Sequence, residues 1–148
     1  MTDSRAYPDR PILAASAAII RDGRVLIVRR ARKPADGVYT LPGGVVEAGE
    51  TLIEAVTREV REETGLETAP VALAGFREMI MRDGGNKVSR HFVILSFAAR
   101  WVSGEVRLNH ELDDARWLLP AEIEGLKTTE GLAEIVAAAF ERLDQAGG

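Results

Sequence analysis

One short segment fixes both ends of a helix, and it restricts the possible folds more than any other part of the chain. Thr51 is followed three residues later by Glu54, the capping-box pattern in which a hydroxyl and a carboxylate satisfy free backbone N–H groups. Gly65 can end the same helix in the left-handed backbone conformation. We therefore predict a helix over residues 52–64.

This helix carries glutamates beside its apolar stripe. Each helical residue turns by about 100°, so Glu59, Glu62 and Glu63 share one face, next to the stripe that runs from Leu52 to Val60. Carboxylates held close together repel each other. Such a face suits either plain exposure to solvent or the binding of a hard cation such as Mg²⁺. Both interpretations stay open on these residues alone.

The composition fits one globular domain. The chain has 148 residues, 46% of them hydrophobic, and this length supports a single core. Its net charge of −4 argues against general binding to nucleic-acid duplexes or anionic membranes, so a phosphate ligand has to be bound locally, by a metal ion or a few arginines. The chain has no cysteine, which excludes disulfides and thiolate metal sites and is typical of a reducing compartment. We expect a cytoplasmic protein.

The first apolar run, residues 12–20, predicts a buried strand. It is too short to span a membrane, which requires about 20 residues. Asp22-Gly23 separates it from a second apolar run at 25–28. Asp-Gly between two such runs is a strong hairpin signal, because both positions of the tight turn need positive φ. The two runs are therefore predicted to pair.

The remaining pattern completes the predicted organisation. We predict a loose leader over residues 1–10 and one domain over 11–148, in which Pro42-Gly43-Gly44 breaks regular structure. Hairpins combined with two helices indicate the α/β class, as a sandwich with a mixed sheet. The other predicted elements are strands at 39–41, 71–81, 87–100, 105–108 and 116–119 and a second helix at 129–143.

The segment that contains the first helix also resembles a known motif. From Gly44 the chain reads GVVEAGETLIEAVTREVREETGL, which is similar to the Nudix box, G-x5-E-x7-R-E-U-x-E-E-x-G-U, where U is a bulky aliphatic residue. The resemblance implies the Nudix fold, an α/β/α sandwich with a mixed sheet. The matching positions are Gly44, Glu50, Arg58, Glu59, Val60, Glu62, Glu63, Gly65 and Leu66.

The resemblance also implies a reaction and residue roles. The implied reaction is Mg²⁺- or Mn²⁺-dependent hydrolysis of a nucleoside diphosphate linked to another group. Arg58 would take part in catalysis by orienting Glu59, while Glu50 would brace the motif and Gly44 and Gly65 would be structural. The implied metal-facing groups are Glu59, Glu62, Glu63 and the backbone carbonyl of Gly43.

The general base of such a reaction has several candidates. Glu111 lies in the segment NHELDDARW, which is expected to form a loop that returns toward the motif. The resemblance makes it a candidate base or metal ligand, and a solvent-exposed loop acid is the alternative. Glu59 or Glu62 could serve as the base instead.

Substrate-binding residues are sought outside the motif. Arg29 and Arg30 precede it and could bind phosphates, although a solvated strand end is the alternative for both. Tyr39 could line a base pocket or belong to the core. His91 lies on a predicted strand and is either a binding residue or an ordinary core or rim histidine.

The substrate itself stays open. The chain resembles small bacterial ADP-ribose pyrophosphatases in length and general style, which favours ADP-ribose or a similar nucleotide sugar. Hydrolysis of (d)NTPs, which sanitises nucleotide pools, is the alternative within the family. A catalytically silent ligand-sensing domain is an alternative of another class, disfavoured by the complete motif. We expect a small-molecule nucleotide as partner, without a nucleic-acid duplex or a membrane; a homodimer is one option for the assembly.

Overall fold

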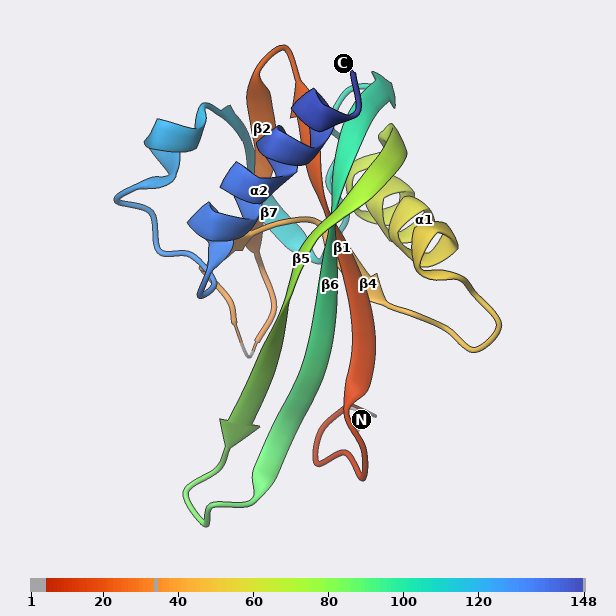
Figure 1. Ribbon diagram of the computed structural model, residues 1–148. Helices are drawn as coiled ribbons and strands as arrows, with labels where there is room; N and C mark the ends of the chain where they lie inside the picture. Colours follow the sequence, from red (N-terminus) through yellow and green to blue (C-terminus); the bar gives the residue numbers. More distant parts are fainter. Residues whose placement is uncertain (1–4, 34, 148) are drawn as a thin grey trace.

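The structure is a computed structural model, in which residues 5–33 and 35–147 are described (Figure 1). It has the predicted first hairpin and both predicted helices. The elements are β1 (Ile12–Arg21), β2 (Arg24–Arg30), β3 (Tyr39–Thr40), β4 (Gly43–Val45), α1 (Leu52–Thr64), β5 (Glu67–Arg82), β6 (Val88–Ser103), β7 (Leu112–Leu118), the 3-10 helix η1 (Pro120–Ile123) and α2 (Leu132–Gln145).

The seven described strands form one mixed sheet. Its order is β3-β2-β1-β6-β5, with β4 paired to β1 and β7 paired to β2. β1 and β6 run parallel, with Ser16 opposite Ser96, and the other paired strands are antiparallel. Helices α1 and α2 lie on opposite faces of this sheet (Figure 1). The predicted α/β/α sandwich with a mixed sheet is therefore confirmed.

Both faces of the central strands are buried, because neighbouring strand residues point to opposite sides. In β2, Leu26 and Val28 pack in the cluster that contains Val56 of α1. Val25 and Ile27 belong instead to the cluster beneath α2. Because a helix covers each face of the sheet, the β2 side chains that point to either face are apolar, and the apolar run in the sequence is continuous. This arrangement explains the continuous apolar runs in the sequence.

The cap and turn residues adopt the predicted conformations. The Glu54 N–H donates to Thr51 Oγ1 at 3.1 Å, and the Thr51 N–H donates to the Glu54 carboxylate at 2.8 Å. Gly65 ends α1 with a φ of 76°. Asp22 and Gly23 both have positive φ, 51° and 76°, as the tight hairpin between β1 and β2 requires.

The predicted strand at 105–108 is wrong. Its segment packs against the end of α1 instead of joining the sheet. The Arg107 N–H donates to the Thr64 carbonyl at 2.8 Å, and the Asn109 N–H donates to the Glu63 carbonyl at 3.1 Å. These bonds satisfy carbonyl groups that the last turn of a helix leaves without partners.

The prediction that Pro42-Gly43-Gly44 breaks regular structure is also wrong for the two glycines. They belong to β4, which pairs with β1 so that Gly43 lies opposite Ser16. A side chain at Gly43 would collide with the backbone of β1 at Ala15 and Ser16. Glycine is therefore required at this position because the two backbones approach each other closely, and not because the chain turns.

The N-terminal segment is described only in part. Residues 1–4, which fall in the predicted loose leader, lie outside the described residues. Tyr7 contacts the far end of the β5–β6 hairpin: its N–H donates to the Ser89 carbonyl and its hydroxyl to Asp83, both at 2.9 Å. Within the described chain, no helix is long and apolar enough to cross a membrane.

Candidate functional site

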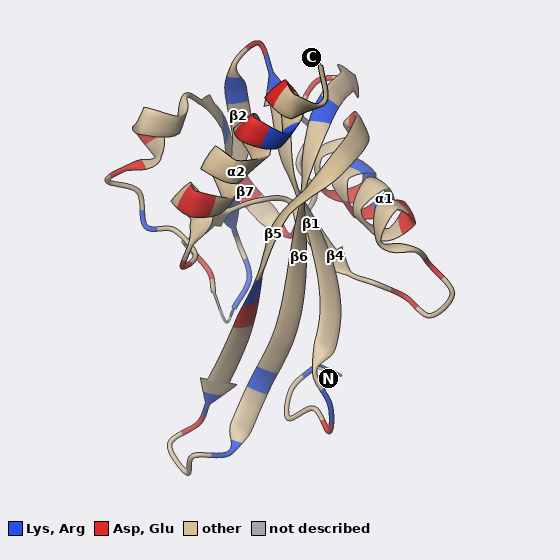
Figure 2. Ribbon diagram, in the orientation of Figure 1, with Lys and Arg blue, Asp and Glu red and all other residues tan. Residues whose placement is uncertain are grey.

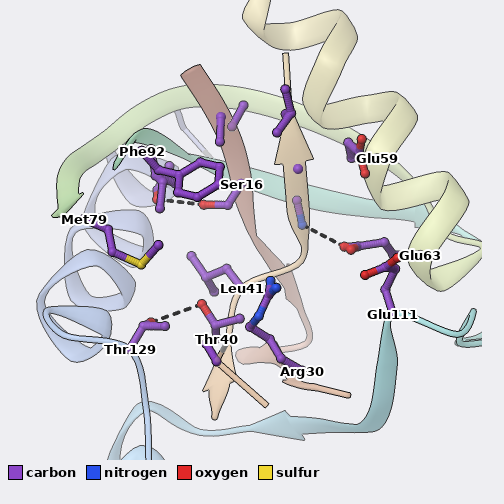
Figure 3. Close-up of a pocket in the computed structure, with 18 of the residues that line it drawn as sticks. Ser16, Arg30, Thr40, Leu41, Glu59, Glu63, Met79, Phe92, Glu111 and Thr129 are labelled. Carbon is purple, nitrogen blue, oxygen red and sulfur yellow. Dashed lines mark hydrogen bonds between the residues drawn. The ribbon is translucent and has the colours of Figure 1, made fainter. Parts of the chain in front are cut away.

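A cavity of about 760 Å³ is lined by residues of the central strands, of α1 and of the start of α2. Figure 3 shows Glu59, Glu63 and Glu111 on one side of it and Met79 and Phe92 on the other. We call the first side, with Glu62 included, the acidic end, and the side that Met79 and Phe92 line the far end.

Helix α1 supplies three of the four carboxylates at the acidic end. Glu59, Glu62 and Glu63 all line the cavity, as their shared helix face predicts, and Figure 2 shows acidic residues along α1. Their exposure differs sharply. The Glu62 side chain is 54% exposed and that of Glu59 is 16% exposed, whereas Glu63 is buried at 7%. The three carboxylates therefore lie in different electrostatic surroundings.

Glu63 is the most buried of these carboxylates. Its Oε1 accepts a hydrogen bond from the Gly43 N–H at 2.9 Å. Burial raises the pKa of Glu63 to about 7, and the negative charges of Glu59 and Glu111 contribute in the same direction. The charged form of Glu63 is therefore unfavourable at neutral pH unless a cation lies beside it.

Glu59 is held between a glycine and an arginine. A side chain at Gly44 would collide with the Glu59 carboxyl group, so the glycine leaves room for it. Arg58 Nη1 donates to Glu59 Oε1 at 2.8 Å. Burial still raises the pKa of Glu59, because it outweighs the attraction of Arg58. This contact agrees with the orienting role expected of Arg58.

Arg58 also ties α1 to the loop before it. It donates to both carboxylate oxygens of Glu50, from Nε at 2.7 Å and from Nη2 at 2.9 Å, and to the Val45 carbonyl at 3.1 Å. The hydrogen bonds from Arg58 hold the pKa of Glu50 down at about 2. Arg58 has two longer ion pairs, to Glu62 of α1 at 3.3 Å and to Glu47 of the preceding loop at 3.9 Å. Glu50 has the geometry of the brace expected from the sequence.

Glu111 reaches the acidic end from the loop before β7. The Ala31 N–H donates to its carbonyl at 2.9 Å, which anchors this loop beside β2. Its carboxylate lies 3.1 Å from His110 Nε2, is 41% exposed, and is close enough to Glu63 to raise the pKa of that group. The loop thus returns toward the motif as predicted, while the chemical role of Glu111 remains a prediction.

The donor groups at the acidic end suit a hard cation. Within residues 5–33 and 35–147, no three Asp, Glu or His side chains form a group arranged to hold one ion. Magnesium does not require such a group, because it commonly binds through one or two carboxylates together with substrate phosphates and water. The buried Glu63 and the neighbouring Glu59 meet this requirement. The carbonyl of Gly43 remains a predicted further ligand.

One of the four predicted substrate-binding residues lines this cavity. Arg30, at the end of β2, lies between the acidic end and the far end (Figure 3). Arg29 is instead paired with Asp113 at 2.5 Å, and it does not line the cavity.

Tyr39 and His91 also lie outside the cavity lining. Tyr39 is a core residue, 6% exposed, whose hydroxyl donates to Asp114 at 2.6 Å. On β6, the two neighbours of His91, Arg90 and Phe92, line the cavity. His91 therefore points to the opposite face of the sheet.

The far end was not predicted from the sequence. It brings together Met79 of β5, Phe92 of β6 and a buried hydroxyl pair, Ser16 and Ser96, whose oxygens lie 2.8 Å apart. Arg77 of β5 lines the same cavity. The only local signals were a serine inside an alanine-rich buried strand and an arginine inside an apolar one. Neither signal indicates a shared cavity, because the strands meet only in the folded sheet.

Comparison with known proteins gives one consistent result. The family model for the NUDIX domain matches residues 10–139. The chain is 34% identical over 107 residues to an ADP-ribose pyrophosphatase of Methanocaldococcus jannaschii, an alignment that covers 72% of this chain and 61% of that protein. It is 33% identical over 146 residues to a MutT-like protein of Streptomyces ambofaciens, covering 98% of this chain and 84% of that protein.

Among solved structures, a MutT NUDIX hydrolase from Burkholderia pseudomallei is similar, with a TM-score of 0.75 and 30% sequence identity. The similarity covers 88% of this chain and 98% of that one. The part of the chain that the family model matches, residues 10–139, contains the motif, the sheet, and both the acidic end and the far end of the cavity.

Proposed function

We propose a hydrolytic function for this chain, which belongs to the NUDIX family. The proposed reaction cleaves the diphosphate bond of a nucleoside diphosphate linked to another group. ADP-ribose or a similar nucleotide sugar is the proposed substrate, and Mg²⁺ or Mn²⁺ is the proposed cofactor. Residues 11–148 would act as one domain. The similarity to a protein named ADP-ribose pyrophosphatase supports this substrate class.

One observation supports this proposal most strongly. A buried glutamate, Glu63, lies beside Glu59 and Glu111 at one end of a cavity of about 760 Å³. Sites for small molecules have volumes of roughly 300–1,000 Å³, so a nucleotide sugar fits the size class. A diphosphate cannot approach these carboxylates without a cation between them, because all the groups are negative.

Glu59 and Glu63 would hold the metal ion, with Glu62 and the Gly43 carbonyl as further candidates. The ion would neutralise the phosphate charges and lower the pKa of attacking water. In the proposed step, the water oxygen forms a bond to one phosphorus and the bridging P–O bond breaks. Glu111 would accept the proton from water, with Glu59 or Glu62 as the alternative base. Arg58 would keep Glu59 in position through its hydrogen bond to the Glu59 carboxylate.

A substrate panel in the presence of Mg²⁺ tests this proposal. ADP-ribose should yield AMP and a sugar phosphate, resolved by chromatography, at a higher kcat/KM than any (d)NTP. If the fastest reaction instead releases nucleoside monophosphate and pyrophosphate from (d)NTPs, the proposed substrate class is wrong. The proposed diphosphate hydrolysis would still hold. If no member of the panel is hydrolysed with either metal, the proposed function is wrong and ligand sensing becomes the better account.

A further inference from the structure

Two arginines lie close together in the wall of the cavity. Arg30 comes from the end of β2 and Arg77 from β5, and both line the cavity. Burial lowers the pKa of Arg77; the Glu130 carboxylate opposes this effect, and the positive charge of Arg30 adds a smaller lowering. Two cations held together in a partly buried wall repel each other, for the same reason as the glutamates at the acidic end. Such a pair is favourable only with an anion between or beside the two groups.

Within the described residues, neither arginine side chain of this pair has an ion pair within 4.0 Å. The Arg77 side chain makes no hydrogen bond there, and the exposed Glu130 attracts it from a longer distance. Arg30 acts on Glu63 in the same way, through its charge and without a hydrogen bond. Arg30 Nε is buried and lacks a hydrogen-bond partner. A buried guanidinium N–H without a hydrogen-bond partner lowers the free energy of unfolding. An acceptor supplied by a ligand would therefore be favourable at this position.

The start of α2 adds a third positive feature. Thr129, Gly131 and Leu132 line the same cavity, and the N-cap residue, Gly131, provides no side-chain hydrogen bond to the first turn. The Leu132 N–H donates to the Thr129 carbonyl at 3.3 Å. The remaining N–H groups of the first turn and the dipole of a helix N-terminus attract anions. The two arginines and this helix start therefore face one volume from different elements of the fold.

We propose that Arg30, Arg77 and the start of α2 bind a phosphate group of the substrate that is not part of the cleaved diphosphate. This inference rests on the proposed function, because that function places the cleaved diphosphate at the acidic end. Two guanidinium groups match the double charge and several oxygens of a phosphate monoester better than a single carboxylate. A substrate with an additional phosphate would then span the cavity from Glu63 to Arg77, past Arg30.

A direct test measures the binding of inorganic phosphate to the metal-free protein by calorimetry. Without a metal ion, the acidic end repels phosphate, so binding reports the arginine pair. Arg77→Gln should weaken binding about tenfold or more, the loss expected for one charge-assisted hydrogen bond. Arg82→Gln is the matched control: Arg82 lies on the same strand, outside the cavity lining, and donates to the Asn86 carbonyl. This control should bind phosphate like the wild type.

Glu130→Gln provides a test of opposite sign. Removing the acidic side chain that faces Arg77 should strengthen phosphate binding, whereas a general loss of folding would weaken it. Arg77→Lys, which keeps the charge and loses the planar fork, should bind with intermediate affinity. Equal affinity of wild type, Arg77→Gln and Arg82→Gln would overturn the inference, as would a stronger effect of the Arg82 change.

The second arm uses two substrates that differ by one phosphate monoester on a ribose, ADP-ribose and its 2′-phosphate. The wild type should favour the phosphorylated compound in kcat/KM, and Arg77→Gln should reduce that ratio about tenfold. An unchanged ratio would overturn the inference. If the wild type hydrolyses neither compound, the proposed function fails, and the phosphate titration still decides whether the anion site exists.

Discussion

Two glutamates of one motif, Glu50 in the loop before α1 and Glu63 inside the cavity, lie in opposite electrostatic surroundings. In the loop before α1, hydrogen bonds from Arg58 lower the pKa of Glu50 to about 2. Inside the cavity, burial raises the pKa of Glu63 to about 7, with Glu59 and Glu111 adding to the effect. The charge of Glu50 is thus stabilised by Arg58 within the protein. The charge of Glu63 has no hydrogen-bonded cationic partner among the described residues.

This contrast separates a structural role from a functional one on physical grounds. A carboxylate whose charge is stabilised in the folded chain contributes to stability. A carboxylate that is buried against other negative charges destabilises the folded chain until a cation binds, and such groups concentrate at functional sites. Changes at the acidic end should therefore affect turnover, and a change at Glu50 should affect stability.

The largest effect is expected at Glu111. If its carboxylate accepts the proton from water, Glu111→Gln should lower kcat by about 10²–10⁴-fold while the affinity for Mg²⁺ stays near that of the wild type. Steady-state kinetics with parallel Mg²⁺ titrations separate a lost base from a lost ligand. A fall in kcat smaller than about threefold would remove Glu111 from the mechanism and leave Glu59 or Glu62 as the base.

Glu63→Gln should lower turnover by about a hundredfold, which corresponds to about 2.7 kcal/mol of transition-state stabilisation. The amide keeps the hydrogen bond from the Gly43 N–H and loses only the charge. The fold should therefore be intact, as circular dichroism can verify. Near-wild-type turnover in this variant would mean that the buried carboxylate is not part of the reacting site.

Glu62→Gln should have a smaller effect, about tenfold in turnover, because this side chain is 54% exposed and pairs with Arg58 at the edge of the cavity. The comparison with Glu63→Gln is made at saturating Mg²⁺. A loss equal to that of Glu63→Gln would show that burial does not distinguish these two carboxylates of the acidic end in the working enzyme.

Glu50→Gln should mainly change stability, with a defined pH dependence. The folded pKa of Glu50 lies below its ordinary value of 4.5, at about 2, so its contribution is fully present above pH 4.5 and is lost as the pH falls toward 2. The wild type should melt at a higher temperature than the variant at pH 6, and the difference should shrink in acid. A difference that stays constant between pH 6 and pH 3 would contradict the brace.

The sequence predicted the features that depend on local residues. Thr51 and Gly65 define the ends of α1, and Asp22-Gly23 sets a tight turn, because these residues act on their immediate neighbours. The glutamates of α1 lie at one cavity, because helix geometry fixes which residues share a face.

Features that depend on contacts between residues far apart in the chain could not be predicted from local sequence patterns. The far end of the cavity depends on the parallel pairing of β1 with β6, which brings Ser16 against Ser96. No local pattern specifies that register. The same limit explains the wrong strand at 105–108, whose N–H groups bond to the end of α1. Arg29 and Tyr39 have the right chemistry for binding, but Asp113 and Asp114 already engage them.

The most direct test of the account compares melting temperatures of the wild type and Glu63→Gln at pH 8, with EDTA and with Mg²⁺. The folded pKa of Glu63 is raised, so its charge destabilises the metal-free protein at this pH, and the destabilisation disappears as the pH falls below its ordinary value. In EDTA the variant should therefore melt at or above the wild type. Added Mg²⁺ should raise the melting temperature of the wild type by mass action and leave the variant nearly unchanged. An equal Mg²⁺ shift in both proteins, or none in the wild type, would contradict a metal site at the acidic end.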